Sequence, residues 1–189
     1  MNKNSTVLIA MVSKDPIVLT KLISVVKPHH VLLFMTQMAQ KNKWVDHAKK
    51  ILEIYKKENI KTYDFCQLPD FEHNPADVYY RKVKEFLTNL SSEQISVIHD
   101  STIGLGIFNV IGAEICRDIC QKLNLSQQIS YLDGDTGNAV FSSMNFPFSV
   151  TTEPVILDFP DNYIKTRANI YDKHVKSGYW TIKGKSKIN

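Results

Sequence analysis

The sequence predicts an α/β fold with a doubly wound, mainly parallel sheet and an antiparallel hairpin at one edge. Two patterns carry this prediction. Strand-like and helix-like segments alternate four times, and two short strand-like runs separated by a glycine-containing turn follow them. Alternation of this kind is typical of a parallel sheet covered by helices on both faces, and the turn indicates a hairpin. The expected arrangement is Rossmann-like in the broad sense.

The first strand is expected over residues 6–12, where an apolar run without alternation indicates burial on both faces. Asp15 and Pro16 then occupy the positions of a helix N-cap and a first helical residue, so a helix is expected over 15–27. The segments expected next are a strand over 31–35, one amphipathic helix over 38–58 and a strand over 61–68.

The remaining elements follow the same alternation before the hairpin. We expect a helix over 75–90, a strand over 94–99, a helix over 103–123, hairpin strands over 128–133 and 139–143, a strand over 153–157 and a short helix near 160–172. The basic tail, 173–189, is interpreted as a surface hairpin around 179–182 or the start of a linker. One domain is expected over 1–165, followed by a C-terminal extension or linker over 166–189.

Composition narrows the class of protein. The chain has 189 residues, of which 43% are hydrophobic and 22% charged, as in ordinary globular domains. Its net charge of +4 suits an anionic ligand but is too small to indicate binding of duplex nucleic acid. Three cysteines without framework spacing indicate free thiols. With no signal peptide and no apolar run of roughly 20 residues, we expect a cytoplasmic protein that does not associate with membranes.

Polar side chains follow several strands where each strand ends, and ligands bind there in open α/β sheets. Ser13 and Lys14 follow the first strand, with Asp15 interpreted as a cap rather than a ligand group. The loop after the fourth strand carries a similar set of small polar residues: Asp100, Ser101, Thr102 and Gly104. Since helix N-termini suit phosphates, these two loops are the main candidates for ligand binding. Thr36, Gln37 and Gln67, at the ends of the second and third strands, are weaker candidates.

Several common sites are not indicated by the sequence. The P-loop pattern, the dinucleotide-binding fingerprint and the nucleophile elbow do not occur, and the histidine spacing fits no standard metal site. No metal or cofactor is therefore expected. Asp70 and Glu72 are interpreted as loop polarity. Gly104 and Gly106 are compatible with either a close ligand approach or tight packing of helix on sheet.

The chain resembles CARF domains, the CRISPR-associated Rossmann-like sensors of type III systems, and most closely the subgroup fused to nuclease domains. The resemblance covers roughly residues 1–165. It is carried by five segments: 7–16 (VLIAMVSKDP), 31–36 (VLLFMT), 100–104 (DSTIG), 131–141 (YLDGDTGNAVF) and 155–163 (VILDFPDNY).

The resemblance implies binding of a cyclic oligoadenylate, usually the four-membered ring, across the two-fold axis of a homodimer. The implied contacts are Ser13, Lys14, Asp100, Ser101, Thr102 and Gly104, with Thr36 and Gln37 flanking them. Many relatives carry Thr-Gly-Gly-Thr-Lys after the fourth strand, whereas this chain reads Ser-Thr-Ile-Gly-Leu over 101–105. Without that lysine, Lys14 is the leading candidate for the cationic contact. The resemblance implies a fused or separate effector as the partner. An effector domain does not fit after about residue 170, so we expect the chain to be either a stand-alone sensor or a piece cut from a longer protein.

Two alternatives to a sensor remain open. A metal-independent ring nuclease would let a ribose 2′-hydroxyl attack the neighbouring phosphate, with Ser13, Lys14 and Thr102 orienting the ring and stabilising charge. An unrelated Rossmann-like protein would bind another nucleotide or act as a structural subunit. A monomeric state would favour the unrelated protein, because a ring shared between two protomers requires two-fold symmetry.

Overall fold

The computed structural model describes residues 5–70, 73–90, 94–104, 106–143, 149–157 and the backbone of 181–182. Its first half contains β1 (Ser5–Met11), α1 (Pro16–Val26), β2 (His30–Met35), α2 (Gln37–Lys41), α3 (Trp44–Lys56), β3 (Thr62–Gln67) and α4 (Pro75–Asn89). Its second half contains β4 (Ile95–Asp100), α5 (Gly106–Lys122), β5 (Ser126–Leu132), β6 (Asn138–Ser143), β7 (Val150–Pro154), β8 (Ile156–Leu157) and β9 (Thr181–Ile182).

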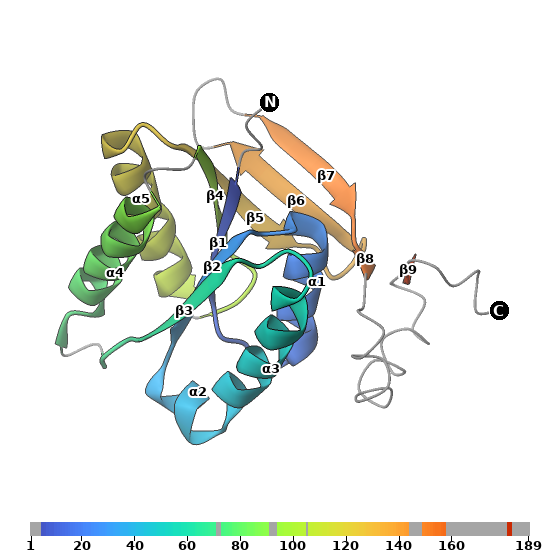
Figure 1. Cartoon of the computed structure of the whole chain (residues 1–189), viewed down its shortest axis with the longest axis horizontal. Coiled ribbons are helices and arrows are strands. Elements are labelled where there is room, and N and C mark those ends of the chain that lie inside the picture. The colour runs from blue at the N-terminus through green and yellow to red at the C-terminus, as the bar shows by residue number, and fades with distance from the viewer. Residues whose placement is uncertain are drawn as a thin grey trace.

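Within these described residues, the main sheet has seven strands in the order β3-β2-β1-β4-β5-β6-β7. The first five strands in this order are parallel, and β6 and β7 continue the sheet antiparallel. Helices α4 and α5 pack together on one face, and α1 and α3 pack together on the other (Figure 1). The predicted doubly wound sheet with an antiparallel edge is confirmed.

The centre of the sheet is built from the apolar runs that the sequence marks as buried. Val7, Leu8 and Ile9 of β1 have no exposed surface, and Val31 and Leu32 of β2 are equally inaccessible. Burying each such side chain contributes about 1.5–3 kcal/mol. The chain adds β2 and β3 on one side of β1 and then β4 and β5 on its other side, so the strand order reverses at β1. Ligands bind at such switch points in open α/β sheets.

The single helix expected over 38–58 is wrong, because the chain breaks it into α2 and α3. Asn42 closes α2 through its side-chain amide, which donates to the carbonyl of Met38 at 2.9 Å. Lys43 then adopts a left-handed conformation with φ of 59°. Such a residue cannot continue a right-handed helix. Local helical periodicity did not reveal the break, because the apolar spacing resumes at Trp44.

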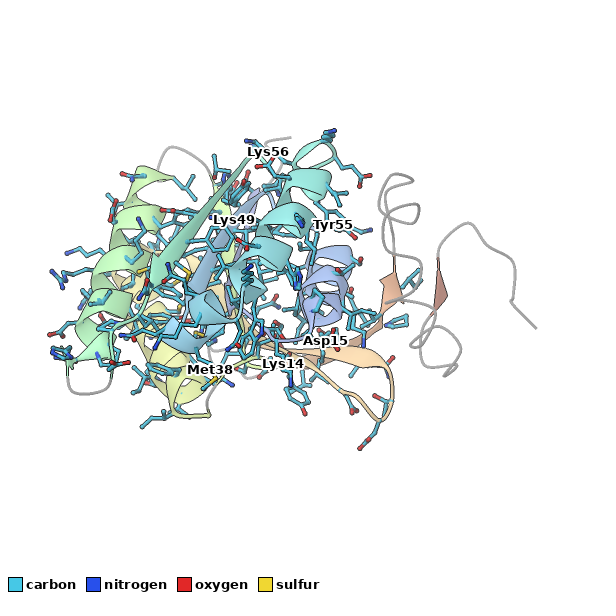
Figure 2. All side chains as sticks on the ribbon, turned by 90° about the horizontal axis from the view of Figure 1, so that it is seen from below. Lys14, Asp15, Met38, Lys49, Tyr55 and Lys56 are labelled. Carbon is cyan, nitrogen blue, oxygen red and sulfur yellow. The ribbon has the colours of Figure 1, made fainter. Side chains whose placement is uncertain are left out.

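Helix α3 shows the expected two-sided pattern. Its buried face carries Val45, Ala48, Ile51, Leu52 and Tyr55. Lys49 and Lys56 lie on the outer side, whereas Lys14, Asp15 and Met38 gather at one end of the molecule (Figure 2). Helical amphipathicity therefore places α3 against the sheet and leaves its lysines in solvent.

The end of the chain differs from the expectation in one respect that the structure describes. The strand expected over 153–157 is divided into β7 and β8, and β8 leaves the main sheet to pair in parallel with β9. The helix expected near 160–172, the rest of the tail and the domain boundary near residue 165 lie outside the described residues.

Candidate functional site

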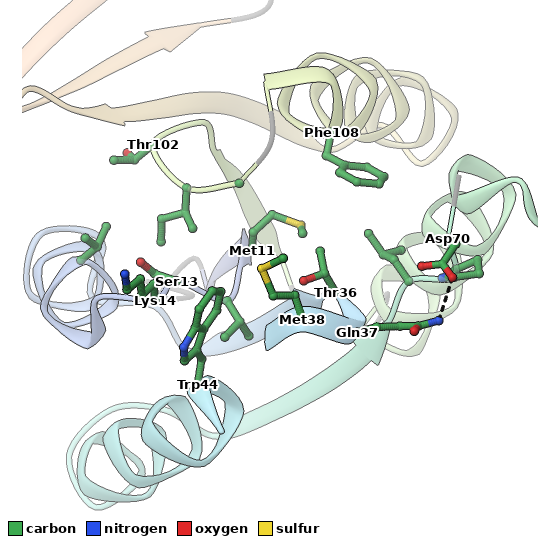
Figure 3. Close-up of a pocket in the computed structure, with 16 residues that line it drawn as sticks. Met11, Ser13, Lys14, Thr36, Gln37, Met38, Trp44, Asp70, Thr102 and Phe108 are labelled. Carbon is green, nitrogen blue, oxygen red and sulfur yellow. Dashed lines mark hydrogen bonds between the residues drawn. The ribbon is translucent and has the colours of Figure 1, made fainter. Parts of the chain in front are cut away.

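A cavity of about 550 Å³ opens at the carboxyl ends of β1, β2, β3 and β4 (Figure 3). Its volume lies within the roughly 300–1,000 Å³ typical of ligand pockets. Six of the eight predicted ligand residues line it: Ser13, Lys14, Thr36, Gln37, Thr102 and Gly104. The other lining residues are Met11, Val12, Val18, Met38, Trp44, Leu68, Pro69, Asp70, Ile103 and Phe108. The parallel topology therefore brings four separate strand ends to one site.

The loop after β1 places a cation beside a capped helix terminus. The Asp15 carboxylate accepts from the backbone N–H of Ile17 at 3.0 Å, which confirms the predicted N-cap of α1. The Ser13 hydroxyl oxygen accepts from the backbone N–H of Asp15 at 3.0 Å, which leaves its own proton available. Lys14 is exposed and makes no ion pair or hydrogen bond within the described part of the chain. Lys14 and Ser13 therefore offer a cation and a hydroxyl donor at this end of the cavity.

Asp100 is the last residue of β4, and the structure does not place it among the residues that line the cavity. Its side chain is 1% exposed, and its carboxylate accepts from the Thr102 hydroxyl at 2.6 Å, the Ile103 N–H at 3.2 Å and the Ser130 hydroxyl at 3.4 Å. Burial raises the pKa of Asp100 to about 6, although these hydrogen bonds favour the ionised form. The buried carboxylate thus holds the loop after β4 in place through these hydrogen bonds.

Ser101 is also absent from the cavity wall. Its N–H donates to the carbonyl of Ser130 at 2.8 Å, and its carbonyl accepts from the Asn109 side-chain amide at 2.9 Å. These bonds join the end of β4 to β5 and α5. Their effect is to fix the backbone from which Thr102 and Gly104 reach the cavity.

Thr102 lines the cavity, but its hydroxyl is already engaged. The hydroxyl donates its proton to Asp100 and accepts from the backbone N–H of Leu132 at 2.8 Å. It therefore has no second proton to donate to a ligand. The methyl group and one oxygen lone pair are what this side chain can still offer.

Gly104 has a conformational reason to be glycine. Its φ is +109°, which side chains of L residues rarely adopt, and a Cβ there would lie 2.8 Å from Cγ of Met11. Gly106, in contrast, has open space around the position of a Cβ. Close packing against Met11 therefore requires a glycine at position 104, which also lines the cavity.

The side of the cavity formed by β2 and β3 adds a second polar pair. The Thr36 hydroxyl oxygen caps α2 by accepting from the Ala39 N–H at 3.2 Å. Next to it, Nε2 of Gln37 donates to Oδ2 of Asp70 at 3.1 Å. Gln67, the other residue considered on this side, is exposed at the end of β3 and does not line the cavity.

Asp70 and the apolar wall residues Met38, Trp44 and Phe108 were not among the site residues predicted from the sequence. Asp70 follows β3, so the rule that polar residues at strand ends meet at one edge could have identified it. Trp44 enters the cavity wall because of the break between α2 and α3, which helical spacing concealed. Phe108 lies on the first turns of α5, where an apolar residue is expected in any case to face the sheet.

Two further properties concern the described residues as a whole. Within them, no three His, Cys, Asp or Glu side chains are placed to hold a metal ion together. None of the helices placed by the structure is both long and apolar enough to span a bilayer. The three cysteines, Cys66, Cys116 and Cys120, are free thiols.

No family model matches the sequence, and no curated protein matches it at a significant level. The fold is similar to that of Can2 from Sulfobacillus thermosulfidooxidans, solved in complex with cyclic tetra-adenylate, with a TM-score of 0.51 and 13% identity. The match covers 79% of this chain and 37% of Can2. Protein VC1899 from Vibrio cholerae gives a TM-score of 0.50 and 13% identity, over 79% of this chain and 36% of that one.

The chain thus spans little more than a third of the length of these two solved proteins. Their likeness to it is one of fold, since the identities are far below the level at which residues can be equated. The seven-stranded sheet described here is the Rossmann-like fold that the resemblance to CARF domains implied, and it is shared with a protein that binds cyclic tetra-adenylate.

Proposed function

We propose that this chain is a CARF-type sensor module that binds a cyclic oligoadenylate, with cyclic tetra-adenylate as the expected ring. One observation carries the proposal: the loops after β1 and β4 meet at one cavity, at the switch point of the sheet. The fold shared with Can2 supports the ring as the ligand, because Can2 was solved with it.

The charges around the cavity suit a nucleotide phosphate. Lys14 supplies a cation without a competing partner in the described residues, and Ser13 can donate its hydroxyl proton. The N-terminus of α1 lies directly after them and is capped by the Asp15 carboxylate. The apolar residues that make up much of the rest of the wall suit the faces of adenine rings.

The same end of the molecule supports a homodimer. Met38, Ile107, Val110 and Tyr131 are large apolar side chains that are 51–66% exposed, and all four belong to segments at the carboxyl ends of β2, β4 and β5. Large exposed apolar side chains of this kind, called the apolar rim below, are typical of a protein interface. A second copy related by a two-fold axis would cover this rim and bring two cavities together around one ring.

We propose sensing rather than ring cleavage as the activity of this chain. Ring nuclease activity would require Ser13, Lys14 and Thr102 to stabilise charge on a reacting phosphate. Thr102 is poorly suited to this role because its proton is held by Asp100. A fused or separate effector is then the partner that would respond to the bound ring. The free thiols are compatible with the reducing cytoplasm, where we expect the sensor to act.

Titration calorimetry with cyclic tri-, tetra- and hexa-adenylate tests the proposal. We expect micromolar or tighter binding of one ring, with one ring bound for every two chains. The mixture is then kept with EDTA and separated by chromatography, and we expect the ring to remain intact. The absence of heat with all three rings would refute the sensor, and conversion of the ring to linear products would establish the nuclease instead.

A further inference from the structure

The cavity has two polar ends of different chemistry. Ser13 and Lys14 lie at one side, and the hydrogen-bonded pair of Gln37 and Asp70 lies at the opposite side (Figure 3). The first end carries the cation described above. The second end carries a carboxylate and an amide, so a phosphate would be repelled there by Asp70. A nucleotide in this cavity would therefore place its phosphate at Lys14 and its base toward Gln37.

The bond to Asp70 determines how the amide of Gln37 is oriented. A carboxylate only accepts hydrogen bonds, so the amide nitrogen of Gln37, and not its oxygen, must face Asp70. The amide then retains one N–H and its carbonyl oxygen, neither of which has a partner among the described residues. A neighbouring donor and acceptor of fixed orientation can form two hydrogen bonds to one flat ligand edge.

We propose that Gln37, oriented by Asp70, recognises the 6-amino group and an adjacent ring nitrogen of an adenine in the ring. This inference rests on the proposed function and names the residues that select the base. The Gln37 carbonyl accepts from the 6-amino group, and its N–H donates to the ring nitrogen, which is the pairing that glutamine makes with adenine in DNA recognition. Guanine presents a carbonyl at position 6, so the Gln37 oxygen would face another acceptor.

The walls beside this pair fit a flat aromatic group. Met11 and Met38 lie between the two polar ends, and Phe108 lies above the Gln37 side of the cavity (Figure 3). Methionine sulfur atoms and phenylalanine rings make favourable contacts with aromatic faces. Met38 is 62% exposed, so this part of the wall is open to solvent.

The test compares two rings by titration calorimetry: cyclic tetra-adenylate and the same ring built from purine riboside, which lacks the 6-amino group. We expect the wild-type chain to bind the adenylate ring at least about fivefold more tightly, since a two-bond contact of this kind contributes about 1–3 kcal/mol. In Gln37→Ala the two affinities should become equal. Asp70→Asn should reduce the preference, because an asparagine no longer fixes the orientation of the Gln37 amide.

Gln40→Ala is the matched control, because Gln40 is an exposed glutamine of the same helix that does not line the cavity. It should keep the wild-type preference. A preference retained in Gln37→Ala would overturn the role of Gln37, and one retained in Asp70→Asn would overturn that of Asp70. If the wild-type chain binds neither ring, the proposed function itself fails. If it binds both rings equally, the proposed function stands and only the recognition of adenine by Gln37 fails. Because Asp70 is exposed, we expect its variant to fold, so a change in the preference can be attributed to the site.

Discussion

The hydroxyl of Thr102 donates to the carboxylate of Asp100 across 2.6 Å and accepts from the N–H of Leu132 at 2.8 Å. One side chain thereby fastens the loop after β4 to the end of β5. This bridge holds the wall of the cavity in place. It also explains why two neighbouring polar residues of the same loop have different surroundings, with Asp100 buried and Thr102 at the cavity.

Replacing Thr102 tests the bridge. In Thr102→Val the Leu132 N–H loses its partner and the buried Asp100 carboxylate loses a donor, so we expect a loss of about 2–3 kcal/mol in the free energy of unfolding. Urea denaturation measures this change. Thr102→Ser keeps the hydroxyl and should lose clearly less. Equal stability of the two variants would show that the bridge contributes nothing.

The buried neighbours His99 and Asp100 should give stability opposite dependences on pH. Burial raises the pKa of Asp100 to about 6 from 3.8, so its contribution to stability is full below about pH 4 and is lost as the pH rises through 6. Burial lowers the pKa of His99 to about 4 from 6.5, so its contribution is full above about pH 6.5 and is lost as the pH falls through 4. The two effects oppose each other between pH 4 and 6.

Single variants should separate these two effects. As the pH rises from 4 to 6, the free energy of unfolding of Asp100→Asn should rise relative to that of the wild type by up to about 3 kcal/mol. The reason is that the asparagine has no proton to lose. His99→Gln should change in the opposite direction over the same range. Denaturant titrations at several pH values measure both, and subtracting the wild-type curve removes the other carboxylates. Parallel curves for a variant and the wild type would contradict the assignment.

Gly112 of α5 is predicted to be required for packing. A Cβ at this position would lie 2.6 Å from Nε2 of His99 and 2.9 Å from the hydroxyl oxygen of Tyr79, two buried atoms that are 3.1 Å apart. Because neither group can move freely in the core, Gly112→Ala should destabilise the fold by about 1–3 kcal/mol despite the better helix propensity of alanine. Gly106→Ala, where a Cβ meets open space, should be neutral or stabilising in the same denaturation experiment.

Lys14 should contribute to ring affinity through its charge. Removing it in Lys14→Ala is expected to weaken binding of cyclic tetra-adenylate at least about tenfold, since a hydrogen bond to a charged group contributes about 1.5–3 kcal/mol. The affinity of the wild type should also fall with added salt more steeply than that of the variant. Lys50→Ala, which removes an exposed lysine of α3 outside the cavity, serves as the control. Unchanged affinity in Lys14→Ala would remove Lys14 from the site.

The proposed dimer should depend on the apolar rim. Val110 is 66% exposed near the start of α5, and a glutamate there would place a charge in the interface. We expect Val110→Glu to sediment as a monomer in analytical ultracentrifugation and to lose ring binding. Val150 is equally exposed but lies at the opposite edge of the sheet, next to Ser142 of β6, so Val150→Glu should remain dimeric. Two variants with the same oligomeric state would argue against this interface.

Much of the fold is determined locally and is therefore visible in the sequence. The apolar run over 7–12 indicates a strand buried on both faces. Asp15 followed by Pro16 is a local signal for the start of a helix, independent of the rest of the fold. The position of the cavity also follows from the sequence, because consecutive parallel strands bring their carboxyl ends to one edge. The buried strand and the helix start depend on residues close together along the chain, whereas the cavity position depends only on the order of the strands.

Tertiary structure alone decided which side chains face the cavity and what holds them. Asp100 and Thr102 are two residues apart, yet one is buried under the loop and the other lines the cavity, because Ser130 of β5 is a partner for the carboxylate. Gln37 and Asp70 are separated by 33 positions and meet only because β2 and β3 are adjacent. A hydrophobic pattern fixes which face of an element is buried, but the partner of a polar side chain depends on packing between elements.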